Sequence, residues 1–226
     1  MVNIKGWKKS EIIFLSFVIV FIITHSIVRQ DSPIATVSAI CGITYTFIAG
    51  KGNPVCYLFG VTGSGFYSYL AFQNLLWGNL LLYLCYYIPM QILGFFQWNK
   101  NLKEGKKEIV KRYLPKKELA VLTFITIAAI IATAFVLNHF HDAHPILDSI
   151  TTVGSIGGMY LTVRRAIEQW IFWMVVNFLS LIMWVSVAMG GARVYSTVIM
   201  WAVYLFLAFY FYFSWRKEIK YSKNNI

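Results

Sequence analysis

Apolar residues are grouped along the chain in eight runs, each separated from the next by a short polar break. The runs cover residues 11–28, 34–50, 54–72, 75–97, 119–138, 146–163, 167–189 and 194–214. A transmembrane helix needs about 20 mainly apolar residues, so each run has a length suited to crossing a bilayer. The pattern predicts an all-α polytopic membrane protein with eight transmembrane helices.

The first run follows Lys5, Lys8 and Lys9, an arrangement that a secretory signal peptide would share. The polar break after it, residues 29–33, contains no obvious small-x-small cleavage site. We therefore expect residues 1–33 to be kept as an additional N-terminal helix.

The second to fourth runs resemble the last three runs. With an offset of 115 residues, Gly42 aligns with Gly157, Tyr45 with Tyr160, Asn53 with Glu168 and Tyr69 with Trp184, and after a shift of two residues Trp98 aligns with Trp215. Four spans separate the starts of the two copies, so both copies have the same orientation. Parallel repeats are a transporter architecture in which substrate binds at the interface between the repeats.

The repeat divides the chain into five parts. They are an N-terminal helix at 1–33, a first three-helix repeat at 34–98, a basic cytoplasmic loop with a linker helix at 99–138, a second three-helix repeat at 139–215 and a basic cytoplasmic tail at 216–226. The basic loop includes an amphipathic stretch, which we expect to lie on the inner membrane surface.

Composition supports the membrane assignment, and the charges indicate the orientation. Only 13% of the residues are charged, whereas a soluble domain carries about 25%. If the N-terminus is cytoplasmic, Arg29 and Arg193 are the only ones of the 20 Lys and Arg that fall outside the cytoplasmic segments. The positive-inside rule predicts this asymmetry. Both termini should be cytoplasmic, and the net charge of +11 then reflects topology and contact with anionic headgroups rather than nucleic-acid binding.

Two stripes of aromatic and amide side chains interrupt the apolar runs. The stripe in the seventh run consists of Trp170, Trp173, Asn177, Ser180 and Trp184. The stripe in the fourth run consists of Tyr87, Gln91, Gly94 and Trp98, with Asn79, Tyr83 and Met90 beside it. Each set shares one face of a helix, and Gly94 could make room between its large neighbours.

Each stripe has more than one interpretation. Aromatic belts form at membrane interfaces, which would explain Trp98, Trp170 and Trp215 near the cytoplasmic boundary. Deeper amides such as Asn177 and Gln91 could hydrogen-bond between helices. Alternatively, the stripes line a substrate pocket, because buried polar groups in membrane proteins usually face the bundle interior. Such a pocket suits a flat polar ring, and its lack of carboxylates and arginines argues against polyamines and phosphorylated substrates.

The stretch RAIEQWIFWMVVN, residues 165–177, resembles the R-x-x-E-x-W-x-x-W-x-x-x-[ND] signature of the PnuC-type nicotinamide riboside transporters of bacteria. Further stretches that resemble this family are Asn53-Pro54, Leu76-Trp77-Gly78-Asn79, Ile88-Pro89-Met90-Gln91 and the segment from Gly94 to Trp98. The resemblance covers residues 34–215.

The resemblance implies a three-plus-one-plus-three arrangement similar to that of SWEET sugar transporters. It also implies facilitated diffusion of nicotinamide riboside across the bacterial inner membrane, with trapping by a cytoplasmic riboside kinase. No cofactor or metal is implied. The substrate-binding residues that it implies are Trp173, Asn177 and Gln91, followed by Trp170, Asn79, Tyr87 and Trp98.

Several alternatives stay open. A related flat vitamin, thiamine or riboflavin, would suit the same architecture. An intramembrane enzyme or sensor would need a nucleophile–base pair or a metal set, and the three cysteines lack metal-ligand spacing. The cluster His139, His141, Asp142 and His144 reads as a solvated outer loop rather than a metal site. The sequence also leaves open whether the protein acts alone or as an oligomer.

Overall fold

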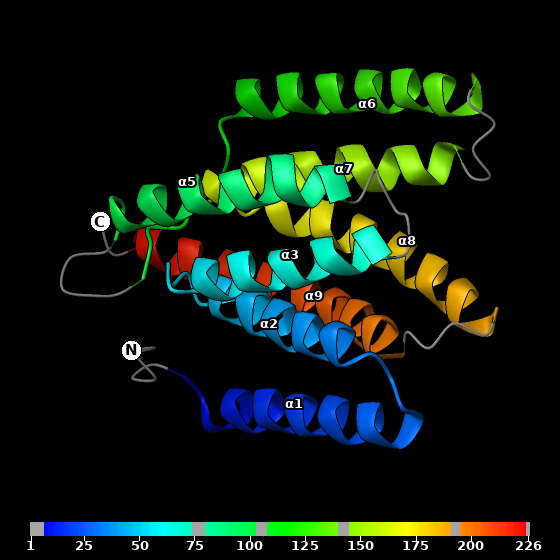
Figure 1. Ribbon diagram of the computed structural model, residues 1–226. Coiled ribbons are helices and arrows are strands. Elements are labelled where there is room, and N and C mark those ends of the chain that lie inside the picture. The colour runs from blue at the N-terminus through cyan, green and yellow to red at the C-terminus, as the bar shows by residue number, and fades with distance from the viewer. Residues whose placement is uncertain (1–6, 74–79, 103–107, 140–144, 191–194, 225–226) are drawn as a thin grey trace.

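The computed structural model describes residues 7–73, 80–102, 108–139, 145–190 and 195–224, in which the regular structure is helical (Figure 1). The elements are α1 (Lys9–Arg29), α2 (Pro33–Gly50), α3 (Cys56–Gln73), the π-helix η1 (Leu82–Tyr87), α5 (Ile88–Asn99), α6 (Lys116–His139), α7 (Pro145–Val163), α8 (Gln169–Met189) and α9 (Tyr195–Asn224). Because η1 runs directly into α5, these elements form eight rods in the described residues, which confirms the predicted fold class.

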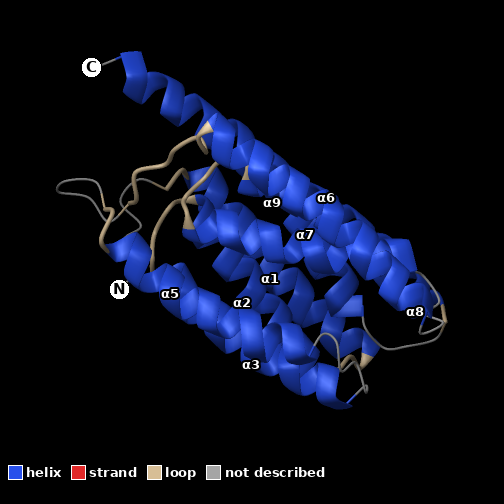
Figure 2. Cartoon of the chain, turned by 90° about the horizontal axis from the view of Figure 1, so that it is seen from above, coloured by secondary structure: helices blue, strands red, loops and turns tan. Residues whose placement is uncertain are grey.

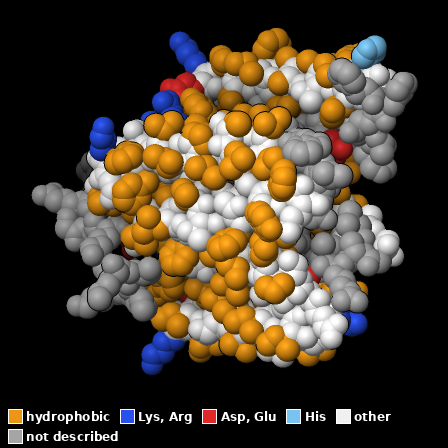
Figure 3. All heavy atoms as spheres, in the orientation of Figure 1, with side chains coloured by type: hydrophobic (Ala, Val, Ile, Leu, Met, Phe, Trp, Pro, Cys, Tyr) orange, Lys and Arg blue, Asp and Glu red, His pale blue; other side chains and the backbone are white. Residues whose placement is uncertain are grey.

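The rods form a bundle that suits a membrane. Six of them, α1, α2, α6, α7, α8 and α9, are long and apolar enough to cross a bilayer by length and composition. Loops gather at the two ends of the rods (Figure 2), and α1 begins at the end where α9 finishes. On the face drawn in Figure 3, an apolar surface extends between the two ends of the bundle. Most of the Lys and Arg side chains on this face lie at the end where α1 begins and α9 finishes.

The two three-helix repeats form the centre of the bundle. They consist of α2, α3 and η1–α5, and of α7, α8 and α9. The first helix of each repeat packs against the last helix of the other, α2 on α9 and α7 on α5. Helices α1 and α6 lie on opposite outer sides (Figure 1), and α6 has no buried residue. The residue boundaries of the five predicted parts stay a prediction.

Helix α1 is held at both ends by buried carboxylates. At one end, Glu11 forms a salt bridge with Lys51 (2.6 Å) and accepts a hydrogen bond from the Tyr210 hydroxyl (2.7 Å). At the other end, Asp31 accepts from the backbone N–H of Ser196 at 2.8 Å. That bond satisfies one of the free N–H groups at the start of α9, so the additional helix is fixed to both repeats.

The fourth rod is irregular next to its proline. Pro89 has no N–H to donate to the preceding turn, and the chain winds as the π-helix η1 immediately before it. The Ile88 N–H bonds to the Tyr83 carbonyl, five residues back. The sequence indicates that Pro89 should kink the helix or break its hydrogen-bond ladder, and the structure has a π-helical turn at this place. Tyr83 and Tyr87 both belong to that turn.

Two features add detail to the sequence-based expectation. Residues 216–224 of the predicted tail continue α9 as a helix. Residues 108–115, which we call the strap, contain no helical turn. They form an extended segment with isolated bridges from Ile109 to Leu102 and from Arg112 to Ala166. Two apolar side chains of the strap, Ile109 (0% exposed) and Leu114 (4%), are buried against the repeats, whereas Val110 (49%) and Tyr113 (45%) are exposed.

Candidate functional site

A cavity lies between the two repeats, and all six of their rods contribute to its wall. It contains about 820 Å³ of space free of protein atoms, part of it open to the surroundings. Its lining consists of Ser38, Gly42, Tyr45, Thr46 and Ala49 of α2, Gly60, Gly63, Ser64 and Tyr67 of α3, Tyr83 and Tyr87 of η1, Gln91 of α5, Met159 and Thr162 of α7, Gln169, Trp170, Trp173 and Asn177 of α8, and Met200, Trp201 and Tyr204 of α9. Within the described chain, α1 and α6 add nothing to this lining.

Helix α8 brings Trp170, Trp173 and Asn177 to the cavity, because positions three and four residues apart lie on one helix face. The indole Nε1 of Trp173 donates to the Thr162 hydroxyl at 3.1 Å. Gly158 lies against the same ring, where an added Cβ would come within 3.1 Å of it. The hydrogen bond and the close backbone together hold the Trp173 ring in one place at the cavity wall.

The first repeat contributes an amide and a group of tyrosines. The Gln91 amide donates to the Ser64 hydroxyl at 3.0 Å, which orients its side chain. The rings of Tyr67 and Tyr83 are stacked with centroids 4.3 Å apart, and Tyr83 meets Tyr87 edge-on at 4.6 Å. This wall therefore offers aromatic surface next to one oriented amide.

Three polar atoms of the lining are buried and have no hydrogen-bond partner among the described residues. They are the Tyr45 hydroxyl and the indole Nε1 atoms of Trp170 and Trp201. A buried donor without a partner costs free energy, so a ligand with acceptor groups would be stabilised here. Asn177, only 3% exposed, adds an amide with both donors and an acceptor.

The wall is uncharged. The described lining contains no Asp, Glu, Lys, Arg or His. In the sequence itself, no charged residue or histidine lies between Lys51 and Lys100 or between Arg193 and Arg216. The cavity therefore suits a flat polar ring with hydroxyl and amide groups, neutral or cationic, and its described wall has no counter-ion for a phosphate.

One end of the cavity is closed by a fully buried aromatic cluster. On α3, α5 and α9 the cluster residues lie nearer to the strap than the lining residues do. Its largest members are Trp98, Trp215, Tyr57, Phe47 and Phe211, and the strap residue Ile109 packs among them. Trp170 belongs to both the cluster and the cavity wall. The structure is therefore closed on the side of the strap.

Of the seven sequence-predicted site residues, Trp173, Asn177, Gln91, Trp170 and Tyr87 line the cavity. Asn79 lies outside the described residues. Trp98 does not line the cavity.

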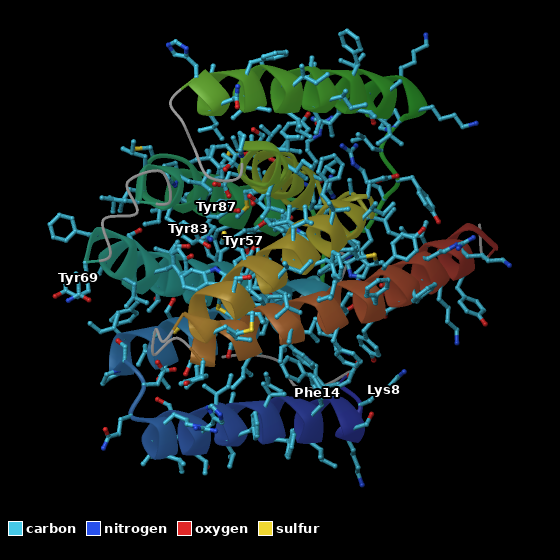
Figure 4. All side chains as sticks on the ribbon, turned by 90° about the vertical axis from the view of Figure 1, so that its right-hand side faces the viewer. Lys8, Phe14, Tyr57, Tyr69, Tyr83 and Tyr87 are labelled. Carbon is cyan, nitrogen blue, oxygen red and sulfur yellow. The ribbon has the colours of Figure 1, made fainter. Side chains whose placement is uncertain are left out.

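The cluster explains where Trp98 and Gly94 belong. The Trp98 indole donates to the Thr162 carbonyl at 2.9 Å, and its ring meets Tyr57 edge-on at 5.1 Å. The space at Gly94 is filled by Tyr57, whose ring would be 2.4 Å from an added Cβ, so Gly94 makes room for a protein side chain. Figure 4 shows Tyr57 pointing into the interior with Tyr83 and Tyr87.

Sequence reasoning did not select several lining residues. Tyr45 and the pair Trp201 and Tyr204 gave a signal, the first as a repeat match and the others as aromatic residues at helical spacing. Thr46 and Ser64 gave none, because small hydroxyl residues are common in membrane helices and usually bond to their own backbone. Only the packing of six helices shows that these side chains share a cavity.

The histidine cluster cannot be located as a unit, because His141, Asp142 and His144 lie outside the described residues. In the part of the chain that the structure describes, no group of three His, Cys, Asp or Glu side chains is arranged to hold a metal ion.

Two parallel three-helix repeats that enclose an uncharged cavity at their interface define an integral membrane transporter. The chain belongs to the family described as "Nicotinamide mononucleotide transporter", which it matches over residues 32–217. The membership predicted from the signature at residues 165–177 is thereby confirmed, and the family is one of transporters rather than enzymes.

Proteins that are similar to this chain over almost its whole length have a name that differs from the family description. The chain is 31% identical over 221 residues to a nicotinamide riboside transporter PnuC of Neisseria mucosa, covering 95% of this chain and 84% of the relative. It is 27% identical over 219 residues to the protein of the same name from Haemophilus influenzae, covering 96% and 94%. A crystal structure of the vitamin B3 transporter PnuC superposes with a TM-score of 0.85 at 29% identity, covering 95% of this chain and 94% of that one.

Proposed function

We propose that this protein transports nicotinamide riboside across the bacterial cytoplasmic membrane. The observation that carries the proposal is the uncharged cavity at the repeat interface, in which indole rings lie beside buried amides and donors without partners. A nicotinamide ring can stack on the indoles, and its carboxamide and the ribose hydroxyls can pair with the polar groups. Because no cationic side chain faces this cavity in the described chain, we expect the riboside to bind rather than its phosphorylated mononucleotide.

The residues divide by what they offer. Trp173 supplies the held ring, and Asn177 and Gln91 supply the amides, so these three should contribute most to binding. Trp170 and Tyr87 add aromatic surface. Asn79 keeps a binding role on the family signature alone, and Trp98 would act indirectly, by supporting the closed end.

Transport by facilitated diffusion fits the same cavity. A coupled transporter needs an ionisable group or ion site within the membrane, and the described cavity wall has none. Direction would then come from a cytoplasmic kinase that converts the riboside into a charged mononucleotide. The clustering of Lys and Arg at the end where α1 begins and α9 finishes supports a cytoplasmic location for both termini.

Calorimetry on the purified protein tests the substrate and the site together. Nicotinamide riboside should bind, and Trp173→Ala and Asn177→Ala should each abolish measurable binding. Trp184→Ala is the matched control, because Trp184 shares the α8 stripe in the sequence but is absent from the cavity lining. Thermal unfolding of each variant separates lost binding from lost folding.

The outcomes are distinct. Binding of thiamine or riboflavin in place of the riboside would keep the site and change the substrate. Equal losses in Trp173→Ala and Trp184→Ala would contradict the assigned cavity. Proteoliposomes without any ion gradient should equilibrate riboside across the membrane, and a requirement for a proton or sodium gradient would contradict facilitated diffusion.

A further inference from the structure

The strap joins the same kind of turn in both repeats. Each turn ends the first helix of its repeat and contains one residue with a positive φ, Gly52 at 74° and Arg165 at 60°. In both turns this residue donates its N–H to the carbonyl three residues back, and the next residue donates to the carbonyl five residues before it. The strap then bonds to the carbonyl of each: Ile109 N–H to Gly52 at 2.9 Å and Arg112 N–H to Arg165 at 3.2 Å.

An arginine therefore occupies the place that a glycine holds in the other repeat. Glycine is the usual residue at this left-handed position after a helix, because a side chain there is strained. Strained backbone tends to persist at functional sites, where the surrounding structure holds it. The backbone at position 165 favours glycine, so the presence of an arginine there indicates a role for its side chain.

Three guanidinium groups meet around the strap. Arg112 Nε donates to the Arg164 carbonyl at 3.1 Å, and Arg165 donates to the Val110 carbonyl at 3.4 Å. Only Arg164 has a carboxylate, Glu118, within salt-bridge distance in the described residues. The Nε atoms of Arg164 and Arg165 are buried and have no hydrogen-bond partner among those residues.

Two of the three guanidinium groups, those of Arg112 and Arg165, have no salt-bridge partner among the described residues. Burial, with the charges of Arg112 and Arg164 added to it, lowers the pKa of the Arg165 guanidinium below its usual value. The nearby carboxylate of Glu168 accepts a hydrogen bond from the Leu114 N–H and forms no salt bridge with the arginines in the described chain. An anion bound here would remove a repulsion that the protein alone leaves in place.

We propose that Arg112, Arg164 and Arg165 form a binding site for a phosphate group at the strap end of the bundle. Guanidinium groups bind phosphate oxygens in pairs, and their planar forks suit this ligand better than any other side chain does. The phosphate can belong to a soluble phosphate ester or to a lipid headgroup. The site is separate from the transport cavity, whose described wall is uncharged, and it does not depend on the identity of the transported vitamin.

Thermal unfolding of the full-length protein in a neutral detergent tests the site. Inorganic phosphate is titrated against chloride at equal ionic strength. We expect phosphate to raise the unfolding temperature saturably, by about 3–6 °C at ten times its dissociation constant. An equal response to phosphate and chloride in the wild type would overturn the proposal without any variant.

Arg165→Gly is the most informative variant. It introduces the residue that the equivalent turn of the first repeat contains, Gly52, and it relieves the backbone strain. It should fold, remain at least as stable as the wild type without phosphate, and lose the phosphate response. Arg216→Gln removes one exposed positive charge from α9 and should keep the full response. If Arg165→Gly lowers the unfolding temperature in phosphate-free buffer and keeps the response, the arginine has only a structural role and the proposal fails.

Nanodiscs of phosphatidylcholine, with and without phosphatidylglycerol, identify the source of the phosphate. If the anionic lipid stabilises the wild type but not Arg165→Gly and removes the effect of inorganic phosphate, the occupant is a headgroup. If inorganic phosphate still acts in the anionic membrane, the occupant is a soluble phosphate compound. An equal effect of the anionic lipid on the wild type and on Arg165→Gly, with no specific effect of phosphate, contradicts the site.

Discussion

Trp98, near the end of α5, and Trp215, within α9, each donate the indole hydrogen to the first helix of the other repeat. Trp98 bonds to the Thr162 carbonyl near the end of α7 at 2.9 Å, and Trp215 bonds to the Gly50 carbonyl at the end of α2 at 2.6 Å. Both side chains are fully buried. Carbonyls at helix ends lack hydrogen-bond partners within their own helix. Each repeat therefore supplies a hydrogen-bond donor to a carbonyl near the end of the other repeat's first helix.

Removing these indole donors should destabilise the bundle unequally. The Thr162 carbonyl also accepts the Arg165 N–H, whereas the only bond to the Gly50 carbonyl in the described chain comes from Trp215. We expect Trp215→Phe to cost about 1–3 kcal/mol and Trp98→Phe about 0.5–1.5 kcal/mol, measured by thermal unfolding. Trp184→Phe should cost less than either, because the Trp184 indole donates to none of the described residues. A reversed order would contradict the capping role.

The fold could be predicted because its main determinants are local in sequence. Runs of apolar residues define the rods, and the aligned pair Trp98 and Trp215 already indicates the repeat. The strap and the tail could not be predicted in the same way. Ile109 is buried beside Gly52, far away in sequence, and Ile219 is 7% exposed in the same cluster. A basic segment with scattered apolar residues reads as surface until its distant partners are known.

The site was predictable to the extent that it lies on single helices. Helical spacing brings Trp170, Trp173 and Asn177 to one face, and the same rule selects Gln91. Helical spacing cannot distinguish a cavity from a packed cluster. It therefore also selects Trp98, which lies on the same face of α5 as Gln91 but belongs to the buried cluster at the closed end. The distinction depends on which side chain of another helix occupies the space, and sequence periodicity contains no such information.

Filling the space at Gly94 should destabilise the closed end. An added Cβ would lie 2.4 Å from the Tyr57 ring, and Tyr57 is 1% exposed, so it cannot move aside freely. We expect Gly94→Ala to cost about 1–3 kcal/mol in unfolding free energy. Gly65→Ala is the matched control on α3, where nothing lies within 4 Å of the added atom. It should be neutral or stabilise by about 0.5–1 kcal/mol, and an equal loss in both variants would argue against the contact.

The Tyr45 hydroxyl should contribute to ligand binding and not to folding. It lines the cavity and has no hydrogen-bond partner among the described residues, so we expect Tyr45→Phe to remove a bond that a ligand forms. We expect riboside affinity to fall about 2- to 10-fold in calorimetry, with an unchanged unfolding temperature. Tyr57→Phe removes a hydroxyl that is equally buried and also without a partner in the described chain, but Tyr57 is absent from the cavity lining. Its affinity should stay at the wild-type value, and parallel losses in both variants would exclude a direct contact.

Glu168, the acidic residue of the family signature, should hold the strap in place. Its carboxylate accepts the buried Leu114 N–H at 3.1 Å, and Glu168→Ala leaves that donor without a partner, at a cost of about 1–3 kcal/mol. Release of the strap should expose the bond after Lys111 to trypsin, so cleavage there should accelerate. Glu168→Gln keeps an acceptor oxygen and should be cleaved at nearly the wild-type rate.

The control for this experiment is a second carboxylate near the strap, that of Glu118. Glu118 forms an exposed salt bridge with Arg164, and such pairs contribute about 0–1 kcal/mol. Glu118→Ala removes a charge as Glu168→Ala does, yet it leaves the strap bonds intact. If both variants accelerate cleavage equally, loss of negative charge rather than loss of the Leu114 bond releases the strap. Faster cleavage in Glu168→Ala alone would show that one signature carboxylate connects the strap to the start of α8, and so to the helix that presents Trp173 and Asn177.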